Sequence, residues 1–245
     1  MRTVSWFAVV VFLAAAPGAV RSEGLVYQLP DDGVWVRFDA DGTGTEPDGT
    51  KVTMAGTITM SCVGTEVVDG QRCRWIEIAS EVKRDDQPFT TLEKLLIPEE
   101  YLAKGQDPTK HVLKGWEKHS MVAGGVPREI KDLEGQGARY LVARLRPMLH
   151  GPFEAPKKLD KVTLDSKLGR LECEGISAQE KTDQAGTSLD STYTIRLHEK
   201  APFGVVAWEG ETKVSKDGQS LGTMSLKLKL SDFGKDAKSS IPDAK

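Results

Sequence analysis

The chain has 245 residues, of which 39% are hydrophobic and 28% are charged, and its formal net charge at pH 7 is −3. This composition is ordinary for a folded soluble protein and excludes collagen-like, coiled-coil and wholly disordered chains. A mildly acidic chain lacks the basic surface typical of nucleic-acid-binding domains, so we expect no nucleic-acid partner.

The N-terminus has the pattern of a secretory signal peptide. Arg2 precedes an apolar stretch over residues 4–16, which Pro17, Gly18 and several small residues follow, and these are the charged, apolar and cleavage regions of such a peptide. We predict cleavage after Ser22 and a secreted or periplasmic mature protein. The alternative is an uncleaved membrane anchor, but a spanning helix needs about 20 apolar residues. We therefore predict no permanent membrane span after cleavage.

The mature chain opens with segments in which apolar and polar residues alternate. The stretch at 51–63 is the clearest, because Ile58, Met60 and Cys62 alternate with threonine and serine. A period of two places one set of side chains on a buried face and the other toward water. Candidate strands in this half cover residues 34–38, 51–63, 72–82 and 89–97.

The C-terminal part of the chain repeats this alternation over residues 193–198 and 224–231. The dipeptides Asp69-Gly70 and Asp217-Gly218 lie between alternating segments, where they indicate tight turns between antiparallel strands. The two halves of the chain therefore predict a mainly antiparallel sheet that is polar on one side.

Between the two blocks of strands, the sequence favours helices. Residues 99–104 follow a proline and end at a glycine, Asp107 precedes a second helix predicted to reach His119, and residues 139–149 form a third;. We predict an α+β fold: a curved, mainly antiparallel sheet forming an open half-barrel, with a mid-chain helical insert that packs on its concave face.

The mature chain shows no linker and no internal repeat. We predict a signal peptide at 1–22, one β-rich half-barrel domain at 23–234 with its helices at about 98–149, and a flexible tail at 235–245. The tail is predicted to be unpaired because its residues are small and polar;.

The three cysteines do not form a dense disulfide framework;. Cys62 and Cys73 flank a hairpin, which turns either through the two residues Asp69-Gly70 or through a three-residue loop that includes Val68. We favour the second, because it pairs Cys62 with Ile76 and matches apolar with apolar residues. Neither register permits the ~5.5 Å Cα separation of a disulfide, so any disulfide would include Cys173, with its partner left open.

No motif in the sequence indicates catalysis or metal binding. There is no G-x-S-x-G elbow, no H-E-x-x-H and no paired C-x-x-C;, and the protein is predicted to be no enzyme and to use neither metal nor cofactor. Read as a calcium loop, the acidic stretch at 39–46 would place Thr50 at the twelfth position, where a bidentate glutamate is required. We therefore favour a solvated hairpin loop there.

Four methionines are candidates for lining an apolar cavity on the concave face: Met54, Met60, Met148 and Met224. Methionine is flexible and adapts to irregular apolar ligands, although it also serves as an ordinary filler of cores. These four residues are the predicted ligand-binding candidates.

The order of signal peptide, strands, mid-chain helices and strands resembles the half-barrel of the periplasmic lipoprotein-carrier superfamily, which also includes envelope-stress sensor domains. Locally, residues 70–77, 97–102, 201–206, 232–234 and 241–243 are similar to uncharacterised secreted proteins of planctomycete-type bacteria. The first resemblance implies the half-barrel architecture, and neither implies an activity.

Two functions follow as expectations. The first is a secreted or periplasmic, non-enzymatic binding protein that carries a lipid, an acyl chain or another apolar ligand in the half-barrel cavity. The alternative is an envelope module that has a structural role or binds another envelope protein through an exposed sheet edge, without a small ligand. A pocket with two carboxylates or a histidine would instead favour an enzyme.

Overall fold

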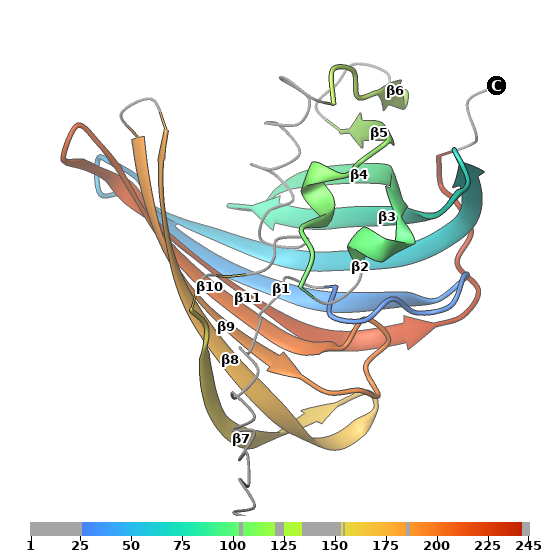
Figure 1. Ribbon diagram of the computed structural model, residues 1–245. Coiled ribbons are helices and arrows are strands. Elements are labelled where there is room, and N and C mark those ends of the chain that lie inside the picture. The colour runs from blue at the N-terminus through green and yellow to red at the C-terminus, as the bar shows by residue number, and fades with distance from the viewer. Residues whose placement is uncertain are drawn as a thin grey trace, which may run out of the picture.

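The computed structural model describes residues 26–102, 105–120, 125–133, 153, 155–184 and 187–241. The predicted signal peptide, the third predicted helix and Met148 lie outside these residues. Strands make up 68% of the described residues and helical turns 4%. The strands form one 11-stranded, open and curved sheet (Figure 1).

Sequence neighbours pair with one another throughout the sheet, except at its centre. The strand order is β6-β5-β4-β3-β2-β1-β11-β10-β9-β8-β7, so the first strand pairs with the last, and the pairings are antiparallel. The strands are β1 (Trp35–Thr45), β2 (Lys51–Val68), β3 (Gln71–Arg84), β4 (Gln87–Pro98), β5 (Lys114–His119), β6 (Arg128–Glu129), β7 (Lys157–Ser166), β8 (Gly169–Gln184), β9 (Thr187–Leu197), β10 (Val205–Lys216) and β11 (Gln219–Gly234).

The predicted α+β fold with a helical insert is wrong. The described part of 98–149 contains only two short 3-10 helices, η1 (Glu99–Leu102) and η2 (Pro108–Lys110), and the expected second helix ends in strand β5. Strand β5 satisfies the backbone groups at the edge of β4, and Gly115 allows Leu95 and Ile130 to pack closely there;. Neither helix in the described residues is long or apolar enough to cross a membrane.

The hairpin between β2 and β3 combines both of the registers considered from the sequence. Asp69 and Gly70 have positive φ, as a two-residue turn requires, so the favoured three-residue loop is wrong;. A bulge between Cys62 and Thr65 then shifts the pairing by one residue, and beyond it Cys62 lies opposite Ile76, as predicted;.

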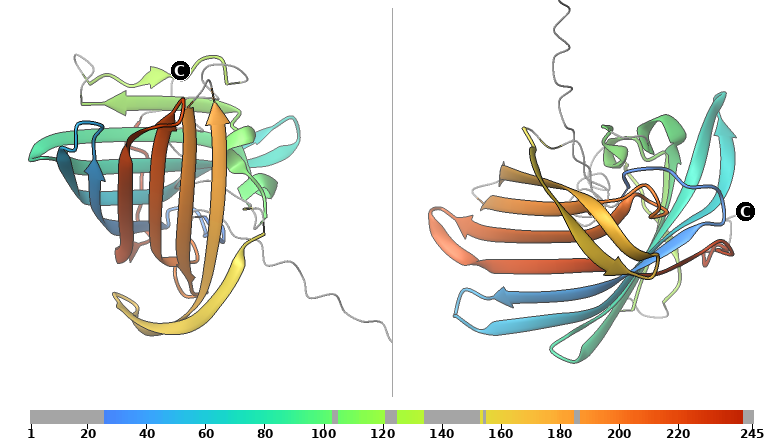
Figure 2. Two further views of the ribbon diagram at one scale, coloured as in Figure 1. Left: turned by 90° about the vertical axis from the view of Figure 1, so that its left-hand side faces the viewer. Right: turned by 90° about the horizontal axis from the view of Figure 1, so that it is seen from below.

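The main core lies on one face of the sheet, which we call the inner face. Phe38 of β1, Ile76 of β3, Cys173 of β8 and Trp208 of β10 belong to one buried cluster. Residues from strands so far apart in the sheet meet only on its concave side. The views in Figure 2 show the cause, a strong twist that turns the strands of the two halves in different directions;.

The outer face is mostly polar, with many charged residues. The acidic stretch at 39–46 was expected to form a hairpin loop, but residues up to Thr45 continue β1, with Asp39 opposite Lys229 and Asp41 opposite Lys227. Opposite charges on neighbouring strands stabilise such a ladder. Among the described residues, no cluster of histidine, cysteine and acidic side chains could hold a metal ion.

The segment from 235, which was expected to be an unpaired tail, crosses the outer face as far as Ile241. Trp35 Nε1 donates to Asp236, Glu77 accepts from Ser240 N, and Lys94 Nζ donates to the Ile241 carbonyl at 3.0 Å. Trp35, Glu77 and Lys94 lie in one row across the sheet, and Lys94 is only 2% exposed. The segment therefore satisfies two buried charged groups of the sheet.

Deleting residues 235–245 should lower the free energy of unfolding by about 2–4 kcal/mol, because the burial of Ile241 and several hydrogen bonds are lost. Urea denaturation of the two chains measures the difference. Deleting only 242–245 is the matched control, because it keeps Asp236, Ser240 and Ile241, which make these contacts. Equal midpoints for the long and short deletions would mean that the segment adds no stability.

All three cysteines are buried free thiols in the structure, with Cys62 on the inner face and Cys73 in a small outer cluster with Trp75. Burial raises the pKa of Cys62 to about 12, although nearby Arg74 opposes the shift.

Because the three thiols are buried, a disulfide-exchange reagent at pH 8 should react with none of them in the native protein and with all three after denaturation. Since the unfolded thiol ionises at a lower pH, the contribution of Cys62 to stability should fall as the pH rises toward 12.

Candidate ligand pocket on the inner face

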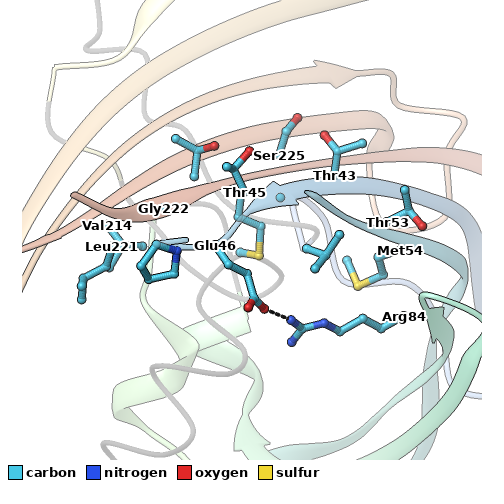
Figure 3. A pocket seen from close by; sticks show the side chains of 15 residues that line it. Thr43, Thr45, Glu46, Thr53, Met54, Arg84, Val214, Leu221, Gly222 and Ser225 are labelled. Carbon is cyan, nitrogen blue, oxygen red and sulfur yellow. Dashed lines mark hydrogen bonds and ion pairs between the residues drawn. The ribbon is translucent and has the colours of Figure 1, made fainter. Parts of the chain in front are cut away.

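A cavity of about 480 Å³ opens on the inner face near the turns that join β1 to β2 and β10 to β11. Its lining comes from β1, β2 and β11, with Arg84 of β3 and Val214 of β10 at its sides (Figure 3). The first and last strands thus build the pocket together.

Two rows of inner-face residues explain why there is space at this point. The row at the last inner-face residue of β1 is Val52, Gly44, Met224, Thr212 and Ser191, and we call it the Met224 row. The next is Met54, Gly42, Leu226, Gly210 and Tyr193, and we call it the Gly42 row. In both rows the β1 residue is a glycine, so β1 adds no side chain to the trough between the side chains of β2 and β11.

The glycines are required by their neighbours. A Cβ atom on Gly44 would lie 2.9 Å from Val52 Cγ2, and one on Gly42 would lie 3.0 Å from Met54 Cε. Any larger residue would push these side chains aside and fill the trough. Glycine at two successive inner positions of β1 was the signal in the sequence that could have located the pocket.

The lining is apolar and partly open to solvent. Val52, Met54 and Val214 contribute apolar surface, while Met224 is 50% and Leu221 37% exposed. Large hydrophobic side chains left this exposed beside a cavity are typical of surfaces that bind apolar ligands.

An ion pair stands at the mouth of the pocket. Arg84, at the end of β3, donates from Nη2 to Glu46, which follows β1, and Figure 3 shows the two side chains meeting across the opening. Both side chains are well exposed, so water and salt screen their attraction;. The mouth is therefore held by a weak contact.

The structure brings two of the four predicted methionines together. Met54 and Met224 line the pocket from opposite sides of β1, whereas Met60 is fully buried in the main core and Met148 lies outside the described residues. The pocket residues Val52, Val214 and Leu221 were missed, because nothing in their local pattern separates them from other strand residues.

A second inner-face cluster is polar and lies on β4 and β5. Glu93 pairs in register with Glu117, which also contacts His119 Nε2 at 2.7 Å and Arg128 Nε at 2.6 Å. Arg128 therefore balances the negative charge of Glu117. None of these residues lines the pocket between β2 and β11, so the two features are separate.

The edges of the sheet bear on the alternative function. Strand β6 has only two residues, and β7 carries Lys157, Lys158 and Lys161 with a pairing irregularity between Leu159 and Val162. Short strands, lysines and bulges are the features by which proteins prevent the pairing of further strands. The described edges are therefore poor docking sites for a partner strand.

Comparisons with known proteins assign no family. No protein-family model and no curated protein matches the chain, so the similarity to planctomycete-type secreted proteins is unsupported. A Bacteroides fragilis structure with a YmcC-like fold, described as a candidate exported protein, aligns at a TM-score of 0.33 and 9% identity, covering 86% of this chain and 99% of that one. A β-barrel-like protein with a domain of unknown function from Brucella abortus aligns at 0.25 and 9%, covering 85% and 98%.

Replacing Arg84 with alanine should change the free energy of unfolding by less than about 1 kcal/mol, because exposed ion pairs contribute little. Arg74→Ala is the contrasting variant: Arg74 is 5% exposed and donates to Glu99 and to the Pro30 carbonyl, so its loss should cost about 3 kcal/mol. Urea denaturation compares the two. If Arg84→Ala lowered the free energy of unfolding as much as Arg74→Ala, the ion pair between Arg84 and Glu46 would be an important support of the fold.

Proposed function

We propose that this protein is a secreted or periplasmic, non-enzymatic binding protein that holds a lipid or another elongated apolar ligand on the inner face of its sheet. The observation that carries the proposal is the glycine-floored trough between Met54 and Met224. The signal-peptide pattern at 1–22 supports the proposed location, since an apolar cargo in the cell envelope requires an exported carrier.

The physical character of the pocket supports an apolar ligand. Burying exposed apolar surface contributes about 25 cal/mol per Å², and Met224 and Leu221 offer such surface to a ligand without any change in the strands. Methionine side chains adapt to different chain shapes, and the volume lies within the usual range for small-molecule sites, about 300–1,000 Å³.

Two observations favour this reading over its competitors. The lysine-bearing and very short edge strands are unsuited to the sheet-edge binding of a protein partner;. The pair of carboxylates at Glu93 and Glu117 would be the natural starting point for an enzyme, but it lies outside the pocket lining, and one of its members is engaged by Arg128.

The variant Met224→Glu tests the proposal. A charge in the trough should weaken binding of the neutral fluorescent probe N-phenyl-1-naphthylamine by roughly tenfold or more, because the carboxylate would lose water when the probe binds. The fold should tolerate the change, since Met224 is half exposed. Fluorescence titration of the mature chain gives the affinity.

The matched control is Val67→Glu, which places the same charge on an exposed apolar residue of β2 that does not line the pocket. It should bind the probe as the unchanged protein does. No binding by the unchanged protein, or equal binding by all three chains, would refute the proposed site.

A further inference from the structure

The inner face contains a buried hydrogen-bond donor for which the described residues supply no acceptor. Trp208 of β10 is 2% exposed, and its indole Nε1 has no hydrogen-bond partner within the part of the chain that the structure describes. A buried tryptophan N–H usually finds an acceptor, because leaving it unsatisfied is costly. An unsatisfied donor on a concave face beside a pocket points to an acceptor that a ligand would supply.

The position of the indole connects it to the pocket. Its six-membered ring lies over Gly210, where a Cβ atom would be only 2.3 Å from Cη2. Gly210 belongs to the Gly42 row, whose other members include Met54 and Leu226. Inner-face residues repeat about every 7 Å along a strand, so the ring reaches along β10 into the Gly42 row, one row short of the row of Met224, which lines the cavity.

A second donor lies in the adjoining Met224 row. The hydroxyls of Ser191 and Thr212 are 2.9 Å apart and share one hydrogen bond. Each hydroxyl carries a single proton, so the pair keeps one O–H that can donate elsewhere. Ser191 is 6% exposed, so a second, largely buried donor group lies in the row next to the one that the indole ring covers.

Resting on the proposed function, we infer that the ligand is an acyl compound, whose carboxylate or ester carbonyl oxygen accepts the Trp208 N–H while its hydrocarbon chain runs along the trough past Met224 and Met54. An acyl oxygen has two lone pairs and can also accept the remaining hydroxyl proton. A pure hydrocarbon would leave the indole N–H unsatisfied. Because Trp208 is covered, the side chains above it must shift when the ligand enters.

The variant Trp208→Phe tests the anchor, since it keeps an aromatic ring and removes only the N–H. Palmitate, methyl palmitate and N-phenyl-1-naphthylamine serve as probes of the mature chain. We expect Trp208→Phe to bind the neutral probe as the unchanged protein does and both acyl compounds roughly tenfold or more weakly. If Trp208→Phe weakens the binding of palmitate alone, the group that the indole binds is a free carboxylate. If it weakens the binding of palmitate and methyl palmitate equally, the group is an acyl carbonyl in general.

The control is Trp75→Phe, because Trp75 packs against Trp116 in the outer cluster and does not touch the inner face. It should leave all three affinities unchanged. If Trp208→Phe does not fold, the ¹⁵N–¹H NMR signal of the Trp208 indole in the unchanged protein tests whether this N–H donates to the ligand. It should move downfield with palmitate, as a newly formed hydrogen bond requires, and not with the neutral probe.

The outcomes separate the anchor from the pocket. Undiminished acyl binding by Trp208→Phe, together with loss of binding by Met224→Glu, would overturn the anchor and leave the pocket standing. An indole signal unmoved by bound palmitate would also overturn it. Failure of the unchanged protein to bind any of the three probes would instead remove the proposed function, and the anchor with it.

Discussion

The whole sheet depends on the pairing of its first strand with its last. β1 and β11 run antiparallel from the Trp35–Gly234 pair to the Thr45–Thr223 pair, with one bulge beside Phe38. Every other pair joins strands that are consecutive in the chain. Without this central pairing, the chain would form two separate meanders, and neither would have the concave face on which the core is built.

The chain reinforces this central pairing on both faces. On the outer face, Trp35 lies over Gly234 and donates to Asp236, while Ala237 N donates to the Gly33 carbonyl. The segment that follows then reaches the buried charges of β3 and β4. On the inner face, apolar residues of both halves pack into one cluster. Contacts between the two ends of a chain are costly to form in entropy, so we expect their assembly to limit the folding rate.

The same pairing creates the pocket. Gly42 and Gly44 lie between β2 and β11, so the gap left by their missing side chains is bounded by Met54 on one side and by Met224 on the other. The indole of Trp208, two strands from β1 on β10, reaches over Gly210 in the same row as Gly42. Stability and proposed binding therefore share one part of the sheet: the strands around β1 close the fold and leave the surface on which an acyl chain would lie.

The sequence by itself determined the strands and their antiparallel turns. Alternation such as that of Ile58, Met60 and Cys62, and the dipeptides Asp69-Gly70 and Asp217-Gly218, are local signals, and they predicted strands and hairpins that the structure contains. A local signal also misled: Asp107 does cap a helix, by accepting from Thr109 N, but that helix lasts only one turn because the following residues pair with the edge of β4. Only the tertiary structure decided three further features. These are the face of β1 that is covered, the strand with which β5 pairs, and the methionines that line one pocket. Those outcomes depend on contacts between residues far apart in the chain, and such contacts leave no pattern in any short stretch of sequence.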